Sequence, residues 1–363
     1  MSSADVGDGW SLRPYRPGDE TQLVELFGRV FGRPLPLETW VWKLKGQRTP
    51  VENVWVAVAD RDGQVIAQYA GIPVRLKLAG TERWAMQSVD TMVSPEFRRR
   101  GILTALGKAT YQSWADGGVS AVFGVPNQNW GTRTDALGLQ PLFPLAWLRV
   151  PLRLGPAVAR MSGAPRAFVA PLARAGDALA SLWRAFASRH DCETPEVQLD
   201  PIAHAGDEFD RLWRGAAGGW DNAVVRDASW VNWRYLHAPG LAYKVLLARA
   251  AGEPAGYVAY RLAEAGSRRT AIIADLFTAP DATCVAAALL AAALADLLSR
   301  GAEAALATAP RYSGLQRTLR RAGFLPRRGT SQVLLAPLAP DVNPSSLRSP
   351  DGWLLAAGDF DVV

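Results

Sequence analysis

Three consecutive arginines, Arg98 to Arg100, and the glycine that follows them are the residues of this sequence best suited to chemistry. They stand directly before residues 102–109, whose apolar members recur at the spacing of one helical face. The first turn of a helix has unpaired N–H groups and the positive end of the helix dipole, and arginines add charge-assisted hydrogen bonds. Gly101 would let an anion approach the backbone closely. We therefore interpret this turn as a pyrophosphate site.

Such a turn needs a strand that leads into it and a helix that follows it. Residues 85–93 have the composition of a strand, and Pro95 then ends the ladder because it has no N–H to donate. A helix is predicted over residues 102–116, ended by two glycines, and a further strand over residues 119–125. The alternative is a solvated basic turn between an ordinary strand and helix.

The run from Arg98 to Leu103, after a Val-x-Pro strand end, resembles the Gln/Arg-x-x-Gly-x-Gly/Ala loop of the GNAT acyl-CoA N-acyltransferase superfamily. Leu103 departs from that pattern. The resemblance implies that strands 85–93 and 119–125 are parallel and splay apart, and that the pantetheine arm of acetyl-CoA lies in the gap. The residues that it implies for the cofactor are Met92, Val93, Arg98, Arg99, Arg100, Gly101, Ile102, Leu103 and Asn127. For Asn127, a simple helix cap is the alternative.

The region before the turn also fits this family. A short strand after Trp10, an Arg-Pro-Gly-Asp turn at residues 16–19 and an amphipathic helix over residues 21–31 are how GNAT domains commonly begin. Residues 54–59 and 65–72 are predicted to form strands joined by the turn 60–63.

The second half of the chain weakly repeats the first. The distance from Asp90 to Asp275 is 185 positions, and so is that from Gly138 to Gly323 in a second matching pair of segments. A third match, Thr39–Lys43 with Ser229–Arg234, keeps the same order. Residues 283–286, which align with the basic turn, contain neither arginine nor glycine. Each charge-assisted hydrogen bond contributes about 1.5–3 kcal/mol, so a copy without the turn should bind the cofactor poorly.

The predicted fold class is therefore α/β, an α+β mixed sheet, with two tandem GNAT-like domains in which helices flank each central sheet. This resembles tandem GNAT proteins of the enhanced-intracellular-survival type. The predicted domains are residues 1–150, the catalytic acyl-CoA-binding domain, 151–205, a linker with an amphipathic helix, and 206–363, a degenerate copy.

Acyl transfer to an amine needs a proton acceptor, because an alkyl ammonium must first lose a proton. Asp90 is one candidate, because a carboxylate inside a strand is costly to bury unless it has a role. The alternative is that it pairs with an arginine or caps a turn. By the resemblance, Asp359, Asp361 or the terminal carboxylate of Val363 could bind a cationic substrate, and a plain final strand is the alternative. The stretch from residue 127 to 137 lacks the tyrosine that often protonates the leaving thiolate in this superfamily.

Aromatic side chains suggest a place for the acceptor. Trp40 and Trp42, with Asn129, could line a substrate pocket, because aromatic faces suit sugar rings and cations. The alternative is that these tryptophans belong to the core, and the similar pair Trp230 and Trp233 in the second half supports packing.

Composition limits the other possibilities. Of the 363 residues 49% are hydrophobic and 20% charged, so the chain can bury sizeable cores and is not disordered. The three histidines lack ligand spacing, and we expect no metal. The net charge of +6 suits an anionic cofactor but is too diffuse to indicate nucleic-acid binding. The two cysteines cannot build a disulfide framework, which favours a cytoplasmic setting. The amphipathic helix expected near residues 168–188 is assigned to packing rather than to a membrane surface.

The sequence thus predicts transfer of an acyl group, expected to be acetyl, from acetyl-CoA to an amine of a small molecule such as an amino sugar or an aminoglycoside-like compound. A Fem-like aminoacyltransferase that uses charged tRNA and a non-catalytic acyl-CoA-binding or assembly protein are the alternatives. The acceptor, the acyl length and the oligomeric state are not predicted.

Overall fold

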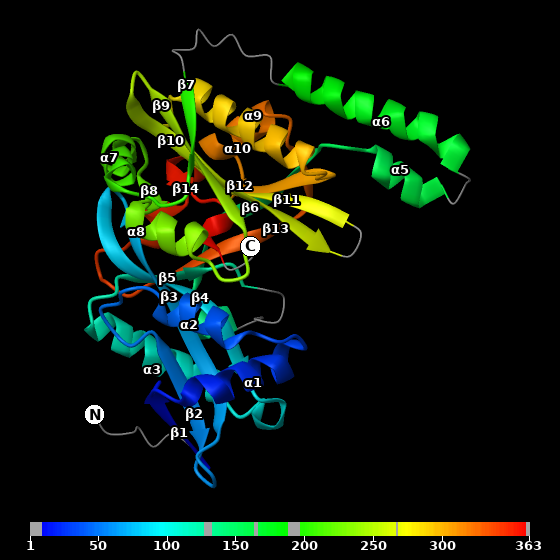
Figure 1. Cartoon of the computed structure of the whole chain (residues 1–363). Coiled ribbons are helices and arrows are strands. Elements are labelled where there is room, and N and C mark those ends of the chain that lie inside the picture. The colour runs from blue at the N-terminus through cyan, green and yellow to red at the C-terminus, as the bar shows by residue number, and fades with distance from the viewer. Residues whose placement is uncertain (1–8, 127–132, 163–165, 188–196, 266–267, 361–363) are drawn as a thin grey trace. The chain divides into compact units, whose positions relative to one another are not determined.

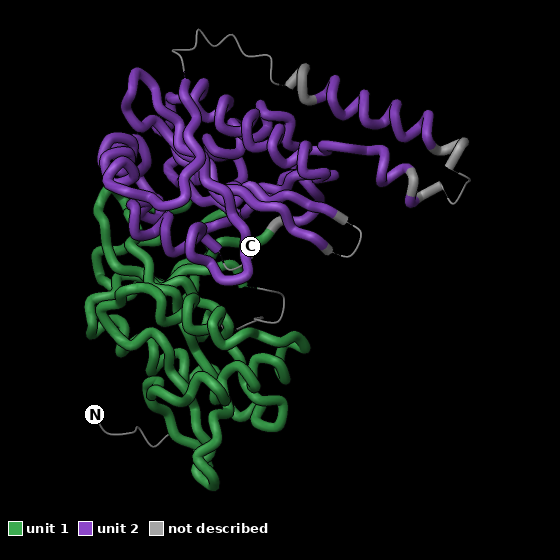
Figure 2. Tube along the Cα trace, in the orientation of Figure 1, with its two compact units in different colours: residues 1–143, 331–349 green, residues 144–330, 350–363 purple. Residues whose placement is uncertain are grey.

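The computed structural model describes residues 9–126, 133–162, 166–187, 197–265 and 268–360. The chain divides into two compact units (Figure 2). Unit 1 consists of residues 1–143 and 331–349, and unit 2 of residues 144–330 and 350–363. Across the described ranges, no helix combines the length and the apolar character that crossing a membrane requires.

Unit 1 is built on a mixed sheet with the strand order β1-β2-β3-β4-β5-β13 (Figure 1). Its neighbouring strands are antiparallel except β4 and β5, which are parallel. The elements of unit 1 are β1 (Trp10–Pro14), α1 (Asp19–Phe31), α2 (Leu37–Lys45), β2 (Val54–Ala59), β3 (Val65–Leu78), β4 (Thr81–Val93), a short helix (Pro95–Phe97), α3 (Ile102–Asp116), β5 (Ala121–Gly124) and α4 (Arg133–Ala136). The helix predicted over residues 102–116 and the hairpin of strands 54–59 and 65–72 are confirmed.

Helix α3 is fixed against the sheet by large apolar side chains. Leu106 and Trp114 are fully buried in one core with Tyr69 of β3 and Met86 of β4. Gly71 makes room for this packing, because a Cβ atom there would lie 2.8 Å from the Trp114 ring. Ile102, the first residue of α3, is buried in the same core, so that the end of the helix beside the basic turn is held as well.

Unit 2 contains a second mixed sheet, with the order β6-β12-β11-β10-β9-β7, in which β11 and β12 are parallel. Helix α9 packs on β9, β10 and β11. Its elements are α5 (Gly155–Ser162), α6 (Arg166–Ala187), β7 (Val197–Ile202), α7 (Asp207–Ala216), β8 (Asn222–Val224), α8 (Ala228–Val231), β9 (Tyr243–Ala250), β10 (Glu253–Ala265), β11 (Arg268–Thr278), α9 (Thr283–Ser299), β12 (Ala304–Pro310), α10 (Gly314–Arg321), β14 (Trp353–Leu354) and a final short helix η6 (Ala357–Asp359). The predicted α/β class, with helices flanking mixed sheets, is confirmed.

Each sheet includes a strand from the other half of the sequence. Strand β6 (Gln140–Pro151) follows β5 in the chain, yet its residues 145–151 pair with β12 in unit 2. Strand β13 (Leu325–Pro337) follows β12, yet Leu334–Pro337 pair with β5 in unit 1. The predicted domain boundaries at residues 150 and 206 do not include this exchange, because matching repeats show which segments correspond but not which segments pair.

Candidate functional site

In unit 1 the parallel strands β4 and β5 separate after three paired residues. Ala85, Met86 and Gln87 pair with residues 121–123, and β4 then continues to Val93. Beyond Gln87, no pairing joins the two strands within the described part of unit 1. The backbone of β4 from residue 88 onward is therefore available, on this side, to a ligand that pairs like a strand.

A β-bulge lies in this open part of β4. Ala70 pairs with Val89 and Gln68 with Met92, so that Asp90 and Thr91 together oppose a single residue of β3. Asp90 has a φ of 45°, in the left-handed region, and its carbonyl oxygen accepts a hydrogen bond of 2.9 Å from Gln68 Nε2. The bulge bends the strand just before its last residues.

The carboxylate of Asp90 forms an ion pair inside unit 1. Its Oδ2 lies 2.6 Å from Nζ of Lys43 on α2, and the two side chains are 7% and 6% exposed. Asp90 is therefore in an ion pair, as the alternative predicted, but the partner is a lysine and not the predicted arginine. Lys43 was not singled out from the sequence, although it ends the segment 39–43 that the repeat drew attention to.

The basic turn that follows is exposed to solvent. Arg98, Arg99 and Arg100 form no ion pair with any acidic residue in the described ranges. Arg98 Nε donates to the carbonyl of Val93 at 3.4 Å, and Arg100 lies over the ring of Phe97, 5.0 Å from its centroid. The three guanidinium groups are thus held loosely at the end of β4, with their charge directed to solvent.

The N-terminus of α3 completes this turn. Gly101 has a φ of 76° and caps the helix with its carbonyl, which accepts from Thr104 and Ala105 at 3.1 Å each. No side chain caps the helix. The amides of Ile102 and Leu103, in the first turn, have no backbone acceptor among the described residues. Two N–H groups, the helix dipole and three arginines therefore converge on one exposed corner.

The conformation of Gly101 leads to a first prediction. A Cβ atom at this position would meet nothing within 4 Å, so the cost of a substitution comes only from the left-handed φ. Gly101→Ala should lower the free energy of unfolding by about 1 kcal/mol, measured by urea denaturation. Gly28→Ala in α1 is the control and should stabilise by a similar amount, because Gly28 has ordinary helical backbone. A loss of equal size in both variants would contradict this explanation.

The other predicted site residues have different surroundings. Trp40 is 1% exposed, and its Nε1 donates to Gln68 Oε1 at 3.3 Å, so that its ring belongs to the packed interior. Trp42 is half-buried on the same helix. Met92 is buried and Val93 half-buried at the end of β4. Three predicted residues and the terminal carboxylate lie outside the described residues, namely Asn127, Asn129, Asp361 and Val363.

Asp359 lies in a buried polar cluster of unit 2. Its Oδ2 accepts from Arg226 Nη2 at 2.6 Å and from the backbone N–H of Ala356 at 2.7 Å. Arg226 also donates from Nε to both oxygens of Asp275, and Tyr235 and Tyr257 donate to Asp275 Oδ2. These contacts give Asp359 a structural role in holding the segment that contains it. The sequence did not single out Arg226.

This segment fills a gap in the second sheet. Strands β11 and β12 pair only at residues 270–272 and 304–306, although β11 continues to Thr278. The short helix η6 contacts both strands. Gly358 lies so close that an added Cβ atom would stand 3.0 Å from the carbonyl oxygen of Ala274. Unit 2 therefore has a splayed strand pair as unit 1 does, but its own chain occupies the opening.

The charge of Asp359 makes the stability of unit 2 dependent on pH. Burial raises the pKa of Asp359 to about 6, with Arg226 opposing the rise and Asp275 adding to it. Because this pKa is higher in the folded chain than in the unfolded one, the resulting stabilisation is present below about pH 4 and is lost as the pH rises through 6. In urea denaturation, the contribution of Asp359 should make the free energy of unfolding about 2 kcal/mol lower at pH 7 than at pH 4.5. Asp359→Asn should remove that part of the difference, and an unchanged difference would contradict the assignment.

A comparison of sequences assigns part of unit 1 to a known family. Residues 11–132 match the sequence profile of the acetyltransferase (GNAT) domain. This segment therefore belongs to the GNAT family. It contains the gap between β4 and β5, the bulge and the basic turn. No curated protein matches the chain by sequence.

Solved structures share the fold over most of the chain. A GCN5-related N-acetyltransferase from Anabaena variabilis has a TM-score of 0.62 at 14% identity, covering 90% of this chain and 72% of the other. For Eis1 from Mycobacterium abscessus the TM-score is 0.57 at 19% identity, with 91% and 73% covered. N-myristoyltransferase from Saccharomyces cerevisiae, with bound myristoyl-CoA, has a TM-score of 0.61 at 10% identity, with 92% and 84% covered. At these identities the likeness concerns the fold alone.

Proposed function

We propose that the protein is an acyl-CoA-dependent N-acyltransferase that transfers acetyl from acetyl-CoA to an amine of a small molecule such as an amino sugar or an aminoglycoside-like compound. The observation that carries this proposal is the open gap between β4 and β5, which leads directly to the basic turn and the uncapped start of α3. Acetyl-CoA carries its thioester on a long polar pantetheine arm that ends in a pyrophosphate. The arm can pair with a free strand edge, and the phosphates require several hydrogen-bond donors close together.

In this proposal each part of the corner binds one part of the donor. The amides of Ile102 and Leu103 and the side chains of Arg98, Arg99 and Arg100 bind the pyrophosphate, and Gly101 permits its close approach. The backbone at Met92 and Val93 pairs with the pantetheine arm, beyond the bulge. Asn127 and Asn129 are proposed contacts of the cofactor and the substrate, and Trp40 and Trp42 support the acceptor side through packing.

The reaction requires a neutral amine. The amine nitrogen attacks the thioester carbonyl carbon, the C–S bond breaks, and the thiolate of coenzyme A leaves and takes up a proton. Deprotonating an alkyl ammonium at pH 7 costs roughly 4–5 kcal/mol, which a proton acceptor must offset. We propose Asp90 for this task, because its carboxylate stands at the bulge beside the open edge of β4; the ion pair with Lys43 makes a positioning role the alternative.

A pair of variants separates these two roles of Asp90. Asp90→Asn alone should lower the free energy of unfolding by about 2 kcal/mol, because it leaves the ammonium of Lys43 buried without its counter-charge. Asp90→Asn combined with Lys43→Met removes both charges and should recover most of that stability. Urea denaturation and kcat are measured on both. If kcat also recovers in the double variant, Asp90 positions the bulge; if kcat stays low, it accepts the proton.

We propose that unit 2 is a degenerate GNAT-like copy with no acyl-CoA site. It has the same succession of a hairpin, a helix, a parallel strand and a further helix, but no arginines precede α9, and η6 stands where the arm would lie. Asp359 then serves to hold η6 through Arg226. In this proposal unit 2 supports the enzyme or shapes the acceptor site.

The proposal also covers the partners and the location of the protein. The acceptor is a small amine, without nucleic acid, membrane or metal partners, and the location is cytoplasmic. Cys284 is disulfide-bonded in the structure, so cysteine usage does not support a reducing compartment, and the location depends on the family alone.

Turnover tests the proposal directly. Acetyl-CoA is supplied with a panel of amines that contains amino sugars, aminoglycosides and polyamines, and release of the free thiol is followed. We expect amine-dependent release with at least one of them. Donor binding without turnover for any amine would favour a non-catalytic acyl-CoA-binding protein, and activity only with charged tRNA would favour a Fem-like aminoacyltransferase.

A further inference from the structure

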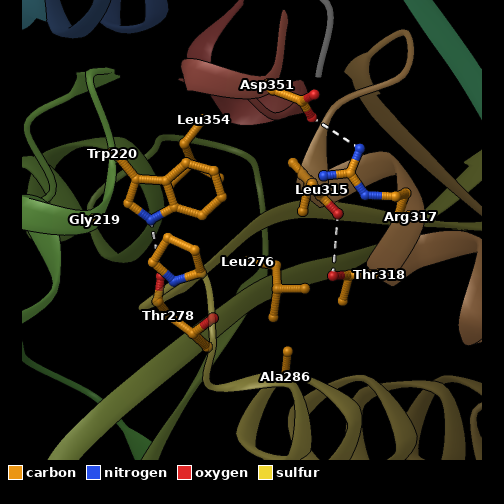
Figure 3. Close-up of a pocket in the computed structure, with 12 residues that line it drawn as sticks. Gly219, Trp220, Leu276, Thr278, Ala286, Leu315, Arg317, Thr318, Asp351 and Leu354 are labelled. Carbon is orange, nitrogen blue, oxygen red and sulfur yellow. Dashed lines mark hydrogen bonds and ion pairs between the residues drawn. The ribbon is translucent and has the colours of Figure 1, made fainter.

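A pocket lies entirely within unit 2 and has no part in the site described for unit 1 (Figure 3). Its volume is about 150 Å³. It is formed by the end of β11, the first turn of α9, the start of α10 and two segments that bring Trp220 and Leu354 to it. The lining residues are Gly219, Trp220, Leu276, Thr278, Pro280, Ala286, Gly314, Leu315, Arg317, Thr318, Asp351 and Leu354.

Part of the pocket wall is formed by apolar side chains. Leu276, Leu315 and Leu354 are each at most 4% exposed. The indole of Trp220 is fixed by a hydrogen bond of 3.0 Å from its Nε1 to the carbonyl oxygen of Thr278, and its ring forms one wall (Figure 3). An apolar cavity of about this volume is large enough for a benzene ring. The walls therefore suit a flat apolar group of that size.

The rim of the pocket carries a positioned cation. Arg317 Nη1 donates to Asp351 Oδ1 and to the carbonyl oxygen of Tyr312, at 2.8 Å each. Nη2 of the same guanidinium lies toward the pocket, 3.7 Å from where a Cβ atom of Gly314 would stand. In the described part of the chain no acceptor is assigned to Nη2. Arg317 can thus receive an anion without giving up its two existing bonds.

The two threonine hydroxyl groups of the lining already donate to backbone carbonyls and are therefore weaker candidates than Arg317 to donate to a ligand. Thr278 Oγ1 donates to the carbonyl of Ala279, and Thr318 Oγ1 to that of Gly314.

The surface beside Arg317 is strongly basic, because Arg320 and Arg321 occupy the exposed side of α10. The sequence from residue 311 to 328 contains six arginines and no acidic residue. This surface favours an anionic ligand and opposes a cationic one.

We propose that this pocket binds a small carboxylic acid with a flat apolar group of about the size of benzene. The ring lies among Trp220, Leu276 and Leu315, and the carboxylate accepts from Nη2 of Arg317. An uncharged ligand of the same shape would lack the charge-assisted bond, and an amine would face the arginines of α10. The pocket is independent of the phosphate-binding turn in unit 1, so the inference does not depend on the proposed acyl transfer.

Three probes of one shape test the chemistry of the ligand. Benzoate, benzyl alcohol and benzylamine are titrated into the full chain, without acyl-CoA, and followed by ligand-observed NMR. We expect benzoate to bind with a dissociation constant on the order of 1 mM, benzyl alcohol about tenfold more weakly and benzylamine not measurably. No benzoate binding at 10 mM, about ten times that constant, would overturn the proposal, and so would equal binding of all three probes.

Variants locate the binding. Arg317→Gln should weaken benzoate binding about tenfold, whereas Arg320→Gln, which removes the same charge from the next turn of α10, should leave it unchanged. Ala286→Leu places extra carbon atoms in the pocket and should abolish binding, with thermal unfolding measured to verify that the fold is kept. Equal weakening in Arg317→Gln and Arg320→Gln would mean a diffuse charge effect. Unchanged binding in Ala286→Leu would mean that the probe binds elsewhere, and either result would refute the proposal.

Discussion

Replacing Arg98 and Arg100 together by alanine is expected to weaken acetyl-CoA binding at least a hundredfold. Each guanidinium is proposed to donate to the pyrophosphate, and a hydrogen bond to a charged group contributes about 1.5–3 kcal/mol. Both side chains are exposed, so solvent screening places the expected effect toward the lower end of that range. Isothermal titration with acetyl-CoA measures the loss. Stability should barely change, because neither arginine has an acidic partner among the described residues.

A matched control is available on α10. Arg320→Ala with Arg321→Ala removes the same charge from two exposed, adjacent positions of unit 2. This double variant should bind acetyl-CoA as the unmodified protein does. Similar weakening in both double variants would show that overall charge, rather than the turn before α3, governs binding of the donor.

Replacing Arg226 by methionine is expected to lower the free energy of unfolding by about 3–5 kcal/mol. The guanidinium is fully buried and is the cationic partner of both Asp275 and Asp359, whose side chains are also 0% exposed. Its removal would leave two carboxylates facing each other away from water. The loss should appear in urea denaturation at pH 7.5 and become smaller at pH 5, where protonation of Asp359 relieves part of the excess charge.

An exposed ion pair of unit 2 provides the comparison for Arg226. Arg249→Met breaks the pair with Asp200, in which the side chains are 27% and 32% exposed, and should change stability by less than about 1 kcal/mol. If Arg226→Met were no more destabilising than Arg249→Met, the cluster would not hold the segment that fills unit 2.

The sequence was most informative where the signal is local. The helix over residues 102–116 could be predicted because its apolar spacing and its terminal glycines are contiguous in the chain. The basic turn could be predicted for the same reason: residues 98–101 are neighbours, and the chemistry of a helix N-terminus does not depend on distant segments.

Features that depend on pairing between distant segments were missed. The exchange of β6 and β13 joins residues about 150 to 215 positions apart, and no spacing in either strand specifies its partner. An ion pair of Asp90 was among the predicted alternatives, but its partner Lys43 was not predicted. Arg226 precedes no recognisable motif, and only the fold brings it to Asp275 and Asp359. The gap in unit 2 could be inferred from the repeat, but its occupation by residues 357–359 could not.

The stoichiometry of acetyl-CoA binding tests the central claim most directly. Isothermal titration of the full chain should give one site per chain, and that site should disappear in the Arg98→Ala, Arg100→Ala variant. Two sites per chain, or one site that survives in this variant, would contradict the account, because the donor would then bind without the turn before α3.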